Sequence, residues 1–265
     1  MKICFVLPPS NWRPFGGYKI VYEYANRLIK LGADVSIVYM NTNALKSFKY
    51  RDIPCLILRA LTEIVTFIEP RWFELDCRVN KISNFNIKKL KYVYDSDVVI
   101  ATAIGTVDYA FDLCSNAKKV YLIQGFECWG KYTTDDVIKT YKTDSIKITI
   151  SKWLKEKVDY YSPKPSILIS NPIDVQKYRC IIPVLKRDRY TIGVLFHKAR
   201  LKGFAIAFEV IKRLKARYQE LTVYMFGAEK PEFRLPKWIS FTLRANQNET
   251  IDIYNKCRVF LCATV

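Results

Sequence analysis

Histidine is nearly absent from this sequence, and its cysteines do not show the spacing of a metal site. His197 is the one histidine among 265 residues, and the eight cysteines form no C-x-x-C pair. A structural zinc site needs four such ligands close together, so the sequence argues against a zinc protein. Several cysteines fall inside apolar runs, which indicates buried free thiols in a reducing compartment rather than a disulfide framework. The cysteines are Cys4, Cys55, Cys77, Cys114, Cys128, Cys180, Cys257 and Cys262.

Long hydrophobic runs and a targeting segment are also missing. No window offers the roughly 18 uncharged apolar residues that a transmembrane helix requires. The amino terminus passes from Met1-Lys2 directly into a strand-like run that ends at Pro8-Pro9, which is too short for a signal peptide. We therefore expect a cytoplasmic protein.

Acidic residues are scarce relative to basic ones. The sequence has 43 Lys and Arg against 25 Asp and Glu, which gives a formal net charge of +18. Such an excess favours nucleic acid, an acidic membrane surface or phosphorylated substrates as partners, and a Lys-rich surface without a partner is a further reading. Because 50% of the residues are hydrophobic, a chain of this length can bury the cores of two domains.

The nicotinamide fingerprint G-x-G-x-x-G does not occur, but a βαβ unit is indicated at the amino terminus. Residues 3–7 form a short apolar run typical of a covered strand, and Gly16-Gly17 ends the loop that follows. Apolar residues then recur at helical spacing over 18–29, and Gly32 stands where a C-terminal cap belongs. A second strand over 35–39 completes the unit, whose crossover makes the sheet parallel.

Short apolar strands recur through the rest of the chain, and its second part repeats the plan of the first. Asn171-Pro172 breaks the pattern, and the following residues are typical of an exposed connector. We predict an α/β protein with two Rossmann-like doubly wound parallel-sheet domains, 1–171 and 190–265, joined by a linker over 172–189. Because the chain ends shortly after a strand, we expect the second domain to be incomplete. The further strands are predicted over 97–102, 120–124, 146–151, 167–170, 191–196, 222–226, 238–242 and 259–262, and helices over 204–218 and 249–256.

Residues 53–68 fit the alternation less well, because they are apolar but interrupted by Arg59 and Glu63. A buried helix is one interpretation. A helix that lies in a membrane interface is the other, and it is favoured by the bulky apolar face and by Arg71, Trp72 and Phe73 just beyond it.

Two glycine-containing turns suit anions. The turn after the strand 191–196 carries Lys198, Arg200 and the pair Lys202-Gly203, and Gly16-Gly17 occupies the corresponding place in the first domain. A strand-to-helix turn presents free backbone N–H groups and the positive end of a helix dipole. Because ligands of parallel α/β sheets bind at the carboxyl ends of the strands, the two turns predict a diphosphate site in a cleft between the domains.

Motifs that follow one another over nearly the whole chain support this interpretation. They are Phe15-Gly16-Gly17, Asp97 to Thr102, Gln124-Gly125-Phe126-Glu127, Ser151-Lys152-Trp153-Leu154, Asn171-Pro172-Ile173-Asp174, His197 through Lys202-Gly203, and Phe226-Gly227. In this order they resemble the retaining glycosyltransferases of the two-Rossmann-domain (GT-B) type, particularly bacterial members that build surface polysaccharides.

The resemblance implies a hexosyltransferase-type enzyme that transfers a sugar from a nucleotide-diphosphate-sugar donor to a glycan or lipid-linked acceptor. It implies retention of anomeric configuration and no metal or other cofactor. We expect no nucleic-acid partner, and a basic surface that places the protein peripherally on the anionic inner face of a membrane. Negative charge develops on the leaving phosphate oxygen, so fixed cations in a dry cleft stabilise the transition state.

By resemblance, Lys202 is the catalytic residue that contacts the donor diphosphate, with Arg200 as its partner. The donor-binding set is Gly16, Gly17, His197, Lys202, Gly203 and Gly227. The acceptor side is assigned to Thr102, Gln124 and Glu127.

Each of these residues has a structural alternative. Gly16-Gly17 can form a simple tight turn, Lys202 can be a solvated lysine of a first helical turn, His197 can be a hydrogen-bonded loop residue, and Glu127 can be a partner for nearby cations. Two glutamates that hold the donor in such enzymes are absent from this sequence, so a non-catalytic binding protein is one rival function. A nucleic-acid-binding protein is the other, and it is disfavoured because the cations are spread over both domains and no known reading module occurs.

Overall fold

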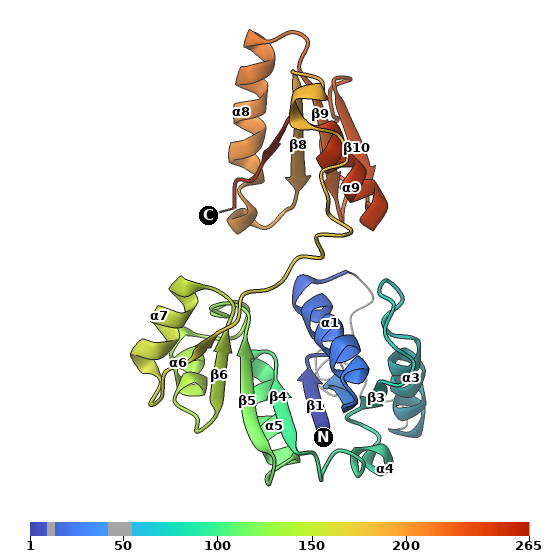
Figure 1. Cartoon of the computed structure of the whole chain (residues 1–265), viewed down its shortest axis with the longest axis vertical. Coiled ribbons are helices and arrows are strands. Elements are labelled where there is room, and N and C mark those ends of the chain that lie inside the picture. The colour runs from blue at the N-terminus through green and yellow to red at the C-terminus, as the bar shows by residue number, and fades with distance from the viewer. Residues whose placement is uncertain (10–13, 42–54, 265) are drawn as a thin grey trace. The chain divides into compact units, whose positions relative to one another are not determined.

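The computed structural model describes residues 1–9, 14–41 and 55–264. The chain divides into two compact units, Met1–Asn171 (unit 1) and Pro172–Val265 (unit 2), and each contains one parallel sheet with helices (Figure 1). The predicted α/β fold with two parallel sheets is confirmed. The segment 172–189, which the sequence predicts as a linker, is grouped with unit 2.

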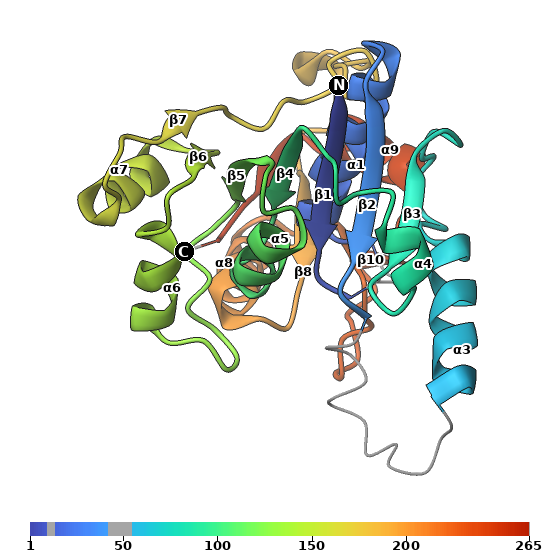
Figure 2. The ribbon, with the colours of Figure 1, turned by 90° about the horizontal axis from the view of Figure 1, so that it is seen from below.

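Unit 1 holds a seven-stranded sheet in the order β3-β2-β1-β4-β5-β6-β7, and every neighbouring pair is parallel (Figure 2). Its strands are β1 (Lys2–Leu7), β2 (Asp34–Tyr39), β3 (Asn80–Ser83), β4 (Val98–Ala101), β5 (Lys118–Ile123), β6 (Ile146–Thr149) and β7 (Ile167–Leu168). Its described helices are α1 (Gly16–Lys30), α3 (Cys55–Ile68), α4 (Ile87–Leu90), the 3-10 turn η1 (Ile104–Thr106), α5 (Val107–Leu113), α6 (Thr134–Tyr141) and α7 (Lys152–Tyr161).

The central strand β1 supplies side chains to both faces of this sheet. Ile3, Phe5 and Leu7 point into one buried cluster together with residues of α1. Cys4 and Val6 point into the other cluster, which the apolar residues of α5, α6 and α7 complete. Successive side chains of a strand alternate between faces, so a strand covered on both faces is apolar throughout. This explains why the amino-terminal run was recognisable as a buried strand.

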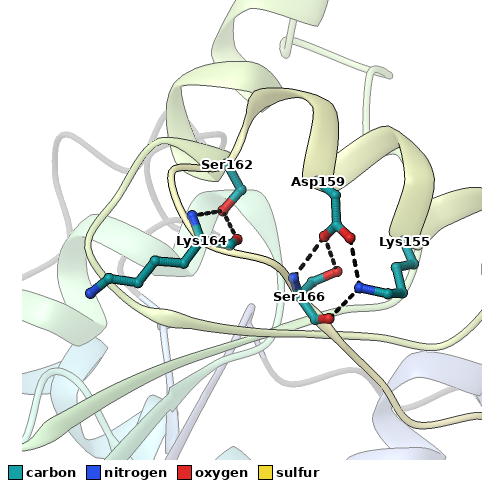
Figure 3. A network of polar contacts seen from close by, with 5 residues as sticks. All are labelled: Lys155, Asp159, Ser162, Lys164 and Ser166. Carbon is teal, nitrogen blue, oxygen red and sulfur yellow. Dashed lines mark hydrogen bonds and ion pairs between the residues drawn. The ribbon is translucent and has the colours of Figure 1, made fainter.

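Short polar contacts fix the connection between α7 and the edge strand β7 (Figure 3). The Asp159 carboxylate accepts hydrogen bonds from the backbone N–H and the hydroxyl of Ser166, at 2.7 and 2.6 Å. Lys155 bridges the same carboxylate and the Ser166 carbonyl, at 2.6 and 2.5 Å. The Ser162 hydroxyl donates to the Lys164 carbonyl at 2.7 Å. The last strand of unit 1 is therefore held to its helix before the chain enters unit 2.

Unit 2 holds a four-stranded parallel sheet in the order β10-β9-β8-β11. On one face, Ile192 and Val194 of β8 pack against Ala207 and Ile211 of α8. The elements are the 3-10 turn η2 (Val184–Lys186), β8 (Thr191–Phe196), the 3-10 turn η3 (Arg200–Lys202), α8 (Phe204–Arg217), β9 (Thr222–Gly227), β10 (Ile239–Leu243), α9 (Gln247–Lys256) and β11 (Val259–Leu261).

Part of the segment 172–189 is tied to α9 within unit 2. The side-chain oxygen of Asn255, which is buried in α9, accepts hydrogen bonds from the backbone N–H groups of Ile181 and Ile182, at 2.7 and 3.2 Å. The Arg187 guanidinium donates to carbonyls at the end of the same helix. Buried amides stabilise a structure when their partners are present, so these bonds hold the entry to unit 2 against its own core.

The helix α3 packs beside β3, as Figure 2 shows, and the described part of its apolar surface is not buried. Ile57, Leu61, Ile64 and Phe67 are each at least half exposed. The interpretation as a buried helix is therefore wrong for these four side chains. In the part of the chain that the structure describes, no helix is long and apolar enough to cross a membrane.

Candidate functional site

The turn between β8 and α8 is shaped by Gly203. This residue has φ 63° and ψ 17°, in the left-handed region that favours glycine, and it precedes the first residue of α8. A Cβ atom at this position would stand 1.8 Å from the carbonyl oxygen of Ala263, so the backbone that follows β11 passes directly against the turn. Both the backbone conformation and the close approach therefore require glycine after Lys202.

The three cations of this turn have different surroundings. The Lys198 ammonium lies 2.7 Å from a carboxylate oxygen of Glu232 and 3.5 Å from one of Glu229, and these contacts raise the pKa of the lysine. Arg200 and Lys202 are exposed, and neither has a carboxylate within ion-pair distance among the described residues. The charge available to an anion at this turn is therefore that of Arg200 and Lys202.

His197 and Gly227 have local structural partners. The His197 Nδ1 atom accepts a hydrogen bond from the backbone N–H of Ala199 at 2.9 Å. A Cβ atom at Gly227, the last residue of β9, would stand 2.7 Å from the carbonyl oxygen of Phe196. The close packing of two strand ends explains this glycine, and the assignment of both residues to donor binding stays a prediction.

In unit 1, Gly16-Gly17 lie at the start of α1, after β1. Gly16 is the first residue of the helix, and a Cβ atom there would meet no described residue within 4 Å. Phe15, the residue before it, makes no side-chain cap to the helix. The space beside Gly16 and the uncapped N–H groups leave a place where an oxyanion can approach the backbone.

Gln124 and Glu127 follow the carboxyl end of β5. The Gln124 Nε2 atom donates to the carbonyl oxygen of Gly17 at 3.2 Å, which links the β5 end to the glycine turn. The Glu127 Oε2 atom accepts from the backbone N–H of Ile104 at 2.6 Å. Burial raises the pKa of Glu127, and the bond from Ile104 partly offsets this shift. Glu127 thus has a backbone partner at the start of η1 rather than one of the nearby cations.

Thr102 is oriented away from solvent. Its side chain is buried, and its hydroxyl donates to the carbonyl oxygen of Val6 at 2.7 Å, so it holds β4 to β1. A ligand can reach this hydroxyl only if that bond is given up. The assignment of Thr102 to the acceptor side stays a prediction that this geometry does not favour.

The structure brings Gly16, Gly17, Gln124 and Glu127 to the carboxyl edge of one sheet, and His197, Arg200, Lys202 and Gly203 to the corresponding edge of the other. Sequence reasoning gave no role to two exposed aromatic residues beside the first group, Phe15 and Trp129. Their signal in the sequence is an aromatic residue directly before a glycine, in Phe15-Gly16 and Trp129-Gly130.

A metal site is not apparent in the described chain. Across residues 1–9, 14–41 and 55–264, no three His, Cys, Asp or Glu side chains are grouped closely enough to hold a metal ion. The expectation that the reaction needs no metal stays a prediction.

Comparison with solved structures defines the fold. The Anabaena protein Alr3699/HepE, solved in complex with UDP-glucose, has a TM-score of 0.64 at 14% identity, and the match covers 98% of this chain and 73% of that chain. TarM has a TM-score of 0.61 at 9% identity, over 94% of this chain and 78% of that one. An alpha-glucosyltransferase in complex with UDP and a 13-mer DNA containing a HMU base has a TM-score of 0.50 at 16% identity. That match covers 88% of this chain and 58% of the glucosyltransferase chain.

These likenesses give the chain the GT-B fold, as the sequence motifs predicted. At such low identities they establish the fold and leave the activity open. No family model matches the chain, and no curated protein matches its sequence.

Proposed function

We propose that this protein is a glycosyltransferase that moves a hexose from a nucleotide-diphosphate-sugar donor to a glycan or lipid-linked acceptor, with retention of configuration. The observation that carries the proposal is the turn after β8, where Arg200 and Lys202 have no carboxylate partner among the described residues. The fold supports it, because proteins of the same fold have been solved with UDP or UDP-glucose.

In the proposed reaction, Lys202 and Arg200 bind the donor diphosphate. When the bond between the sugar and the diphosphate breaks, negative charge grows on the phosphate oxygen that leaves. Fixed cations at that oxygen stabilise the transition state more than the ground state, because the charge is larger there. Gly203 precedes the first turn of α8, whose backbone N–H groups would face the same phosphates.

The proposed acceptor side is the carboxyl edge of the unit 1 sheet, where Gln124 and Glu127 lie. The Gln124 amide is oriented by its bond to Gly17, so its remaining N–H and its carbonyl oxygen can bind hydroxyl groups. Glu127 keeps a raised pKa, so its carboxylate is a better proton acceptor than an ordinary glutamate.

We further propose a cytoplasmic protein that lies peripherally on an anionic membrane surface. The exposed apolar residues of α3 would enter the interface, and the net charge of +18 would favour anionic headgroups. Near such a surface each well-placed Lys or Arg contributes about 1 kcal/mol.

The test of the donor site compares Lys202→Ala with the matched control Lys198→Ala. Binding of UDP-glucose is measured by calorimetry, and turnover by release of UDP in the presence of candidate acceptors. Loss of a charge-assisted bond to phosphate should weaken binding by about 10- to 100-fold in Lys202→Ala. Lys198→Ala should change it by less than about threefold, because that charge is already paired with Glu232.

Equal affinity in the wild type and in Lys202→Ala would contradict the assignment of Lys202. Binding that depends on Lys202, with only background UDP release in the wild type and in the variant, would favour the non-catalytic glycosyltransferase-like protein.

A further inference from the structure

Two large aromatic side chains lie exposed at the carboxyl edge of the unit 1 sheet. Phe15 is 56% exposed and Trp129 is 57% exposed. Phe15 stands before α1, and Trp129 stands in the loop after β5. Exposed apolar side chains that border polar groups often mark a ligand site. The free protein leaves them in contact with water, and a bound ligand buries them.

Each ring lies beside a glycine next to or opposite Gln124. A Cβ atom at Gly17 would lie 3.5 Å from the Phe15 ring and 3.4 Å from Gln124 Nε2, so this ring and the amide are neighbours across the glycine. A Cβ atom at Gly125, the residue after Gln124, would lie 3.6 Å from Trp129 Cη2. The Phe15 ring therefore lies beside the Gln124 amide, and the Trp129 ring lies beside Gly125, the next residue of the chain.

The amide is fixed in place and only partly used. Gln124 Nε2 donates one hydrogen bond to Gly17, and among the described residues the side chain makes no other. A primary amide has two N–H donors and a carbonyl with two lone pairs, so at least one donor and one acceptor remain for a ligand. They lie beside the Phe15 ring, and the Trp129 ring borders the next residue, Gly125.

A pyranose ring has the complementary chemistry. Its C–H groups form an apolar face that packs against an aromatic ring by dispersion, and its hydroxyl groups donate and accept around the edge. The geometry points to a carbohydrate-stacking platform, made of Phe15, Gln124 and Trp129, that binds a pyranose ring of the acceptor. This inference rests on the proposed glycosyltransferase function, whose acceptor side it specifies.

A nucleic-acid strand would also stack on aromatic rings, but the charges nearby fit it less well. The Glu127 carboxylate follows Gln124 by three residues and would repel a phosphodiester. A neutral ring with hydroxyl groups meets no such repulsion.

The test uses the full chain and the variants Trp129→Ala and Phe15→Ala, with Tyr92→Ala as a control. Tyr92 is 74% exposed and precedes β4, at the opposite end of the strands. Saturation-transfer NMR measures binding of the methyl pyranosides of glucose, galactose, mannose and N-acetylglucosamine at millimolar concentration. Circular dichroism and calorimetry with UDP-glucose show whether each variant keeps its fold and its donor site.

At least one of the methyl pyranosides should bind to the wild type with saturation on its apolar C–H face. Trp129→Ala and Phe15→Ala should each weaken that binding by about 3- to 10-fold, while Tyr92→Ala leaves it unchanged and all three variants bind UDP-glucose like the wild type. Trp129→Phe should recover part of the loss.

Binding of UDP-glucose without binding of any of the four pyranosides would overturn the platform and leave the proposed donor function intact. Equal pyranoside binding in the wild type and both alanine variants would overturn it as well. The same experiment is repeated with a ten-nucleotide single strand of thymidine. If this strand binds more tightly than any pyranoside, and the two alanine variants lose that binding, the rings belong to a nucleic-acid site and the platform is overturned. Pyranoside binding through the platform without binding of any nucleotide-sugar would instead contradict the proposed donor function.

Discussion

Lys198 and Lys202 belong to the same turn but differ in what they can bind. The sequence presents both as cations that surround an anion site. In the folded unit, the loop after β9 places Glu229 and Glu232 against Lys198, and this ion pair leaves Lys202 as the better candidate for a phosphate. A difference of this kind arises from residues distant in the chain, and spacing within the turn cannot reveal it.

Glu69 is a buried carboxyl group just after α3. Its residue is 2% exposed, and its Oε2 atom has no hydrogen-bond partner among the described residues. Burial raises the pKa of Glu69 to about 7, while the charges of Arg71 and Lys81 act in the opposite direction. An ionised carboxylate that lacks a hydrogen bond on one buried oxygen is costly, so this group favours its neutral form.

The groups that face Glu69 include three tyrosines of the same core. Burial and the nearby carboxylate raise the pKa values of Tyr18 and Tyr39, and burial raises that of Tyr22 as well. These hydroxyls therefore stay neutral across the physiological range, and Glu69 is the group whose charge changes there.

We predict that Glu69 makes unit 1 less stable as the pH rises. The folded-state pKa of about 7 lies above the ordinary value of 4.5, so the stability contributed by the neutral carboxyl is complete below pH 4.5 and is lost as the pH passes through 7. Glu69→Gln should remove this loss and raise the free energy of unfolding at pH 8 by about 1 to 3 kcal/mol. Urea denaturation at pH 5 and pH 8 measures the difference.

The exposed Glu156→Gln is the control, because it changes the same charge without changing a buried carboxyl. If the wild type and Glu69→Gln lose the same stability between the two pH values, Glu69 does not titrate in the way proposed.

At the scale of elements, α3 has an apolar face without a described partner. Ile57, Leu61, Ile64 and Phe67 recur at intervals of three and four residues, so they lie along one side of the helix. Next to that side, the Lys81 ammonium is 5.5 Å from the centroid of the Phe67 ring. An apolar helix face bordered by a cation is typical of helices that lie in a membrane interface.

We predict that the double variant Leu61→Ser/Phe67→Ser binds anionic vesicles more weakly than the wild type. Each exposed apolar side chain that enters the interface contributes of the order of 1 kcal/mol, so the pair should cost about 10- to 30-fold in partition coefficient. Flotation with vesicles of phosphatidylglycerol and phosphatidylcholine measures the partition.

Leu31→Ser is the matched control, since Leu31 is 82% exposed at the end of α1 and lies outside this face. Binding that falls equally in the control, or that is unaffected in the double variant, would show that α3 does not enter the interface. Added salt should weaken the electrostatic part in all variants alike.

At the scale of the whole molecule, each unit has its own core. Unit 1 buries one apolar cluster on each face of its sheet, and unit 2 buries a cluster between its sheet and α8. The boundary between the units falls between Asn171 and Pro172. A unit with a complete sheet and a core on each face can fold alone.

We predict that the polypeptide 1–171 folds by itself with a cooperative unfolding transition. The polypeptide 1–143 is the control, because it lacks β6, α7 and β7 and therefore the fully buried Leu154 and Val158. Thermal and urea denaturation followed by circular dichroism should show a steep transition for the longer polypeptide and none for the shorter one. Similar gradual transitions in both would contradict the assignment of 1–171 as an independent unit.

Much of the fold was readable from the sequence because the signal is local. The runs 3–7 and 191–196 are continuously apolar, as strands covered on both faces must be, and they became β1 and β8. The strand β3, NKIS, has too few apolar residues to show either pattern, and it was missed. The buried interpretation of 53–68 was wrong for Ile57, Leu61, Ile64 and Phe67, since composition does not tell which side of a helix another element covers.

The sequence by itself determined two parallel α/β units, the glycine turns at their first strands and the cations after β8, because strand alternation, helix periodicity and turn residues depend on neighbours in the chain. Only the tertiary structure decided which of these cations is already paired, that the Thr102 hydroxyl is bonded to Val6, and that Phe15 lies beside Gln124 and Trp129 beside Gly125. All but the last of these contacts join residues that are distant in the sequence and lie on different strands or loops. Their distances follow from how the sheet is ordered and packed, which no local pattern specifies.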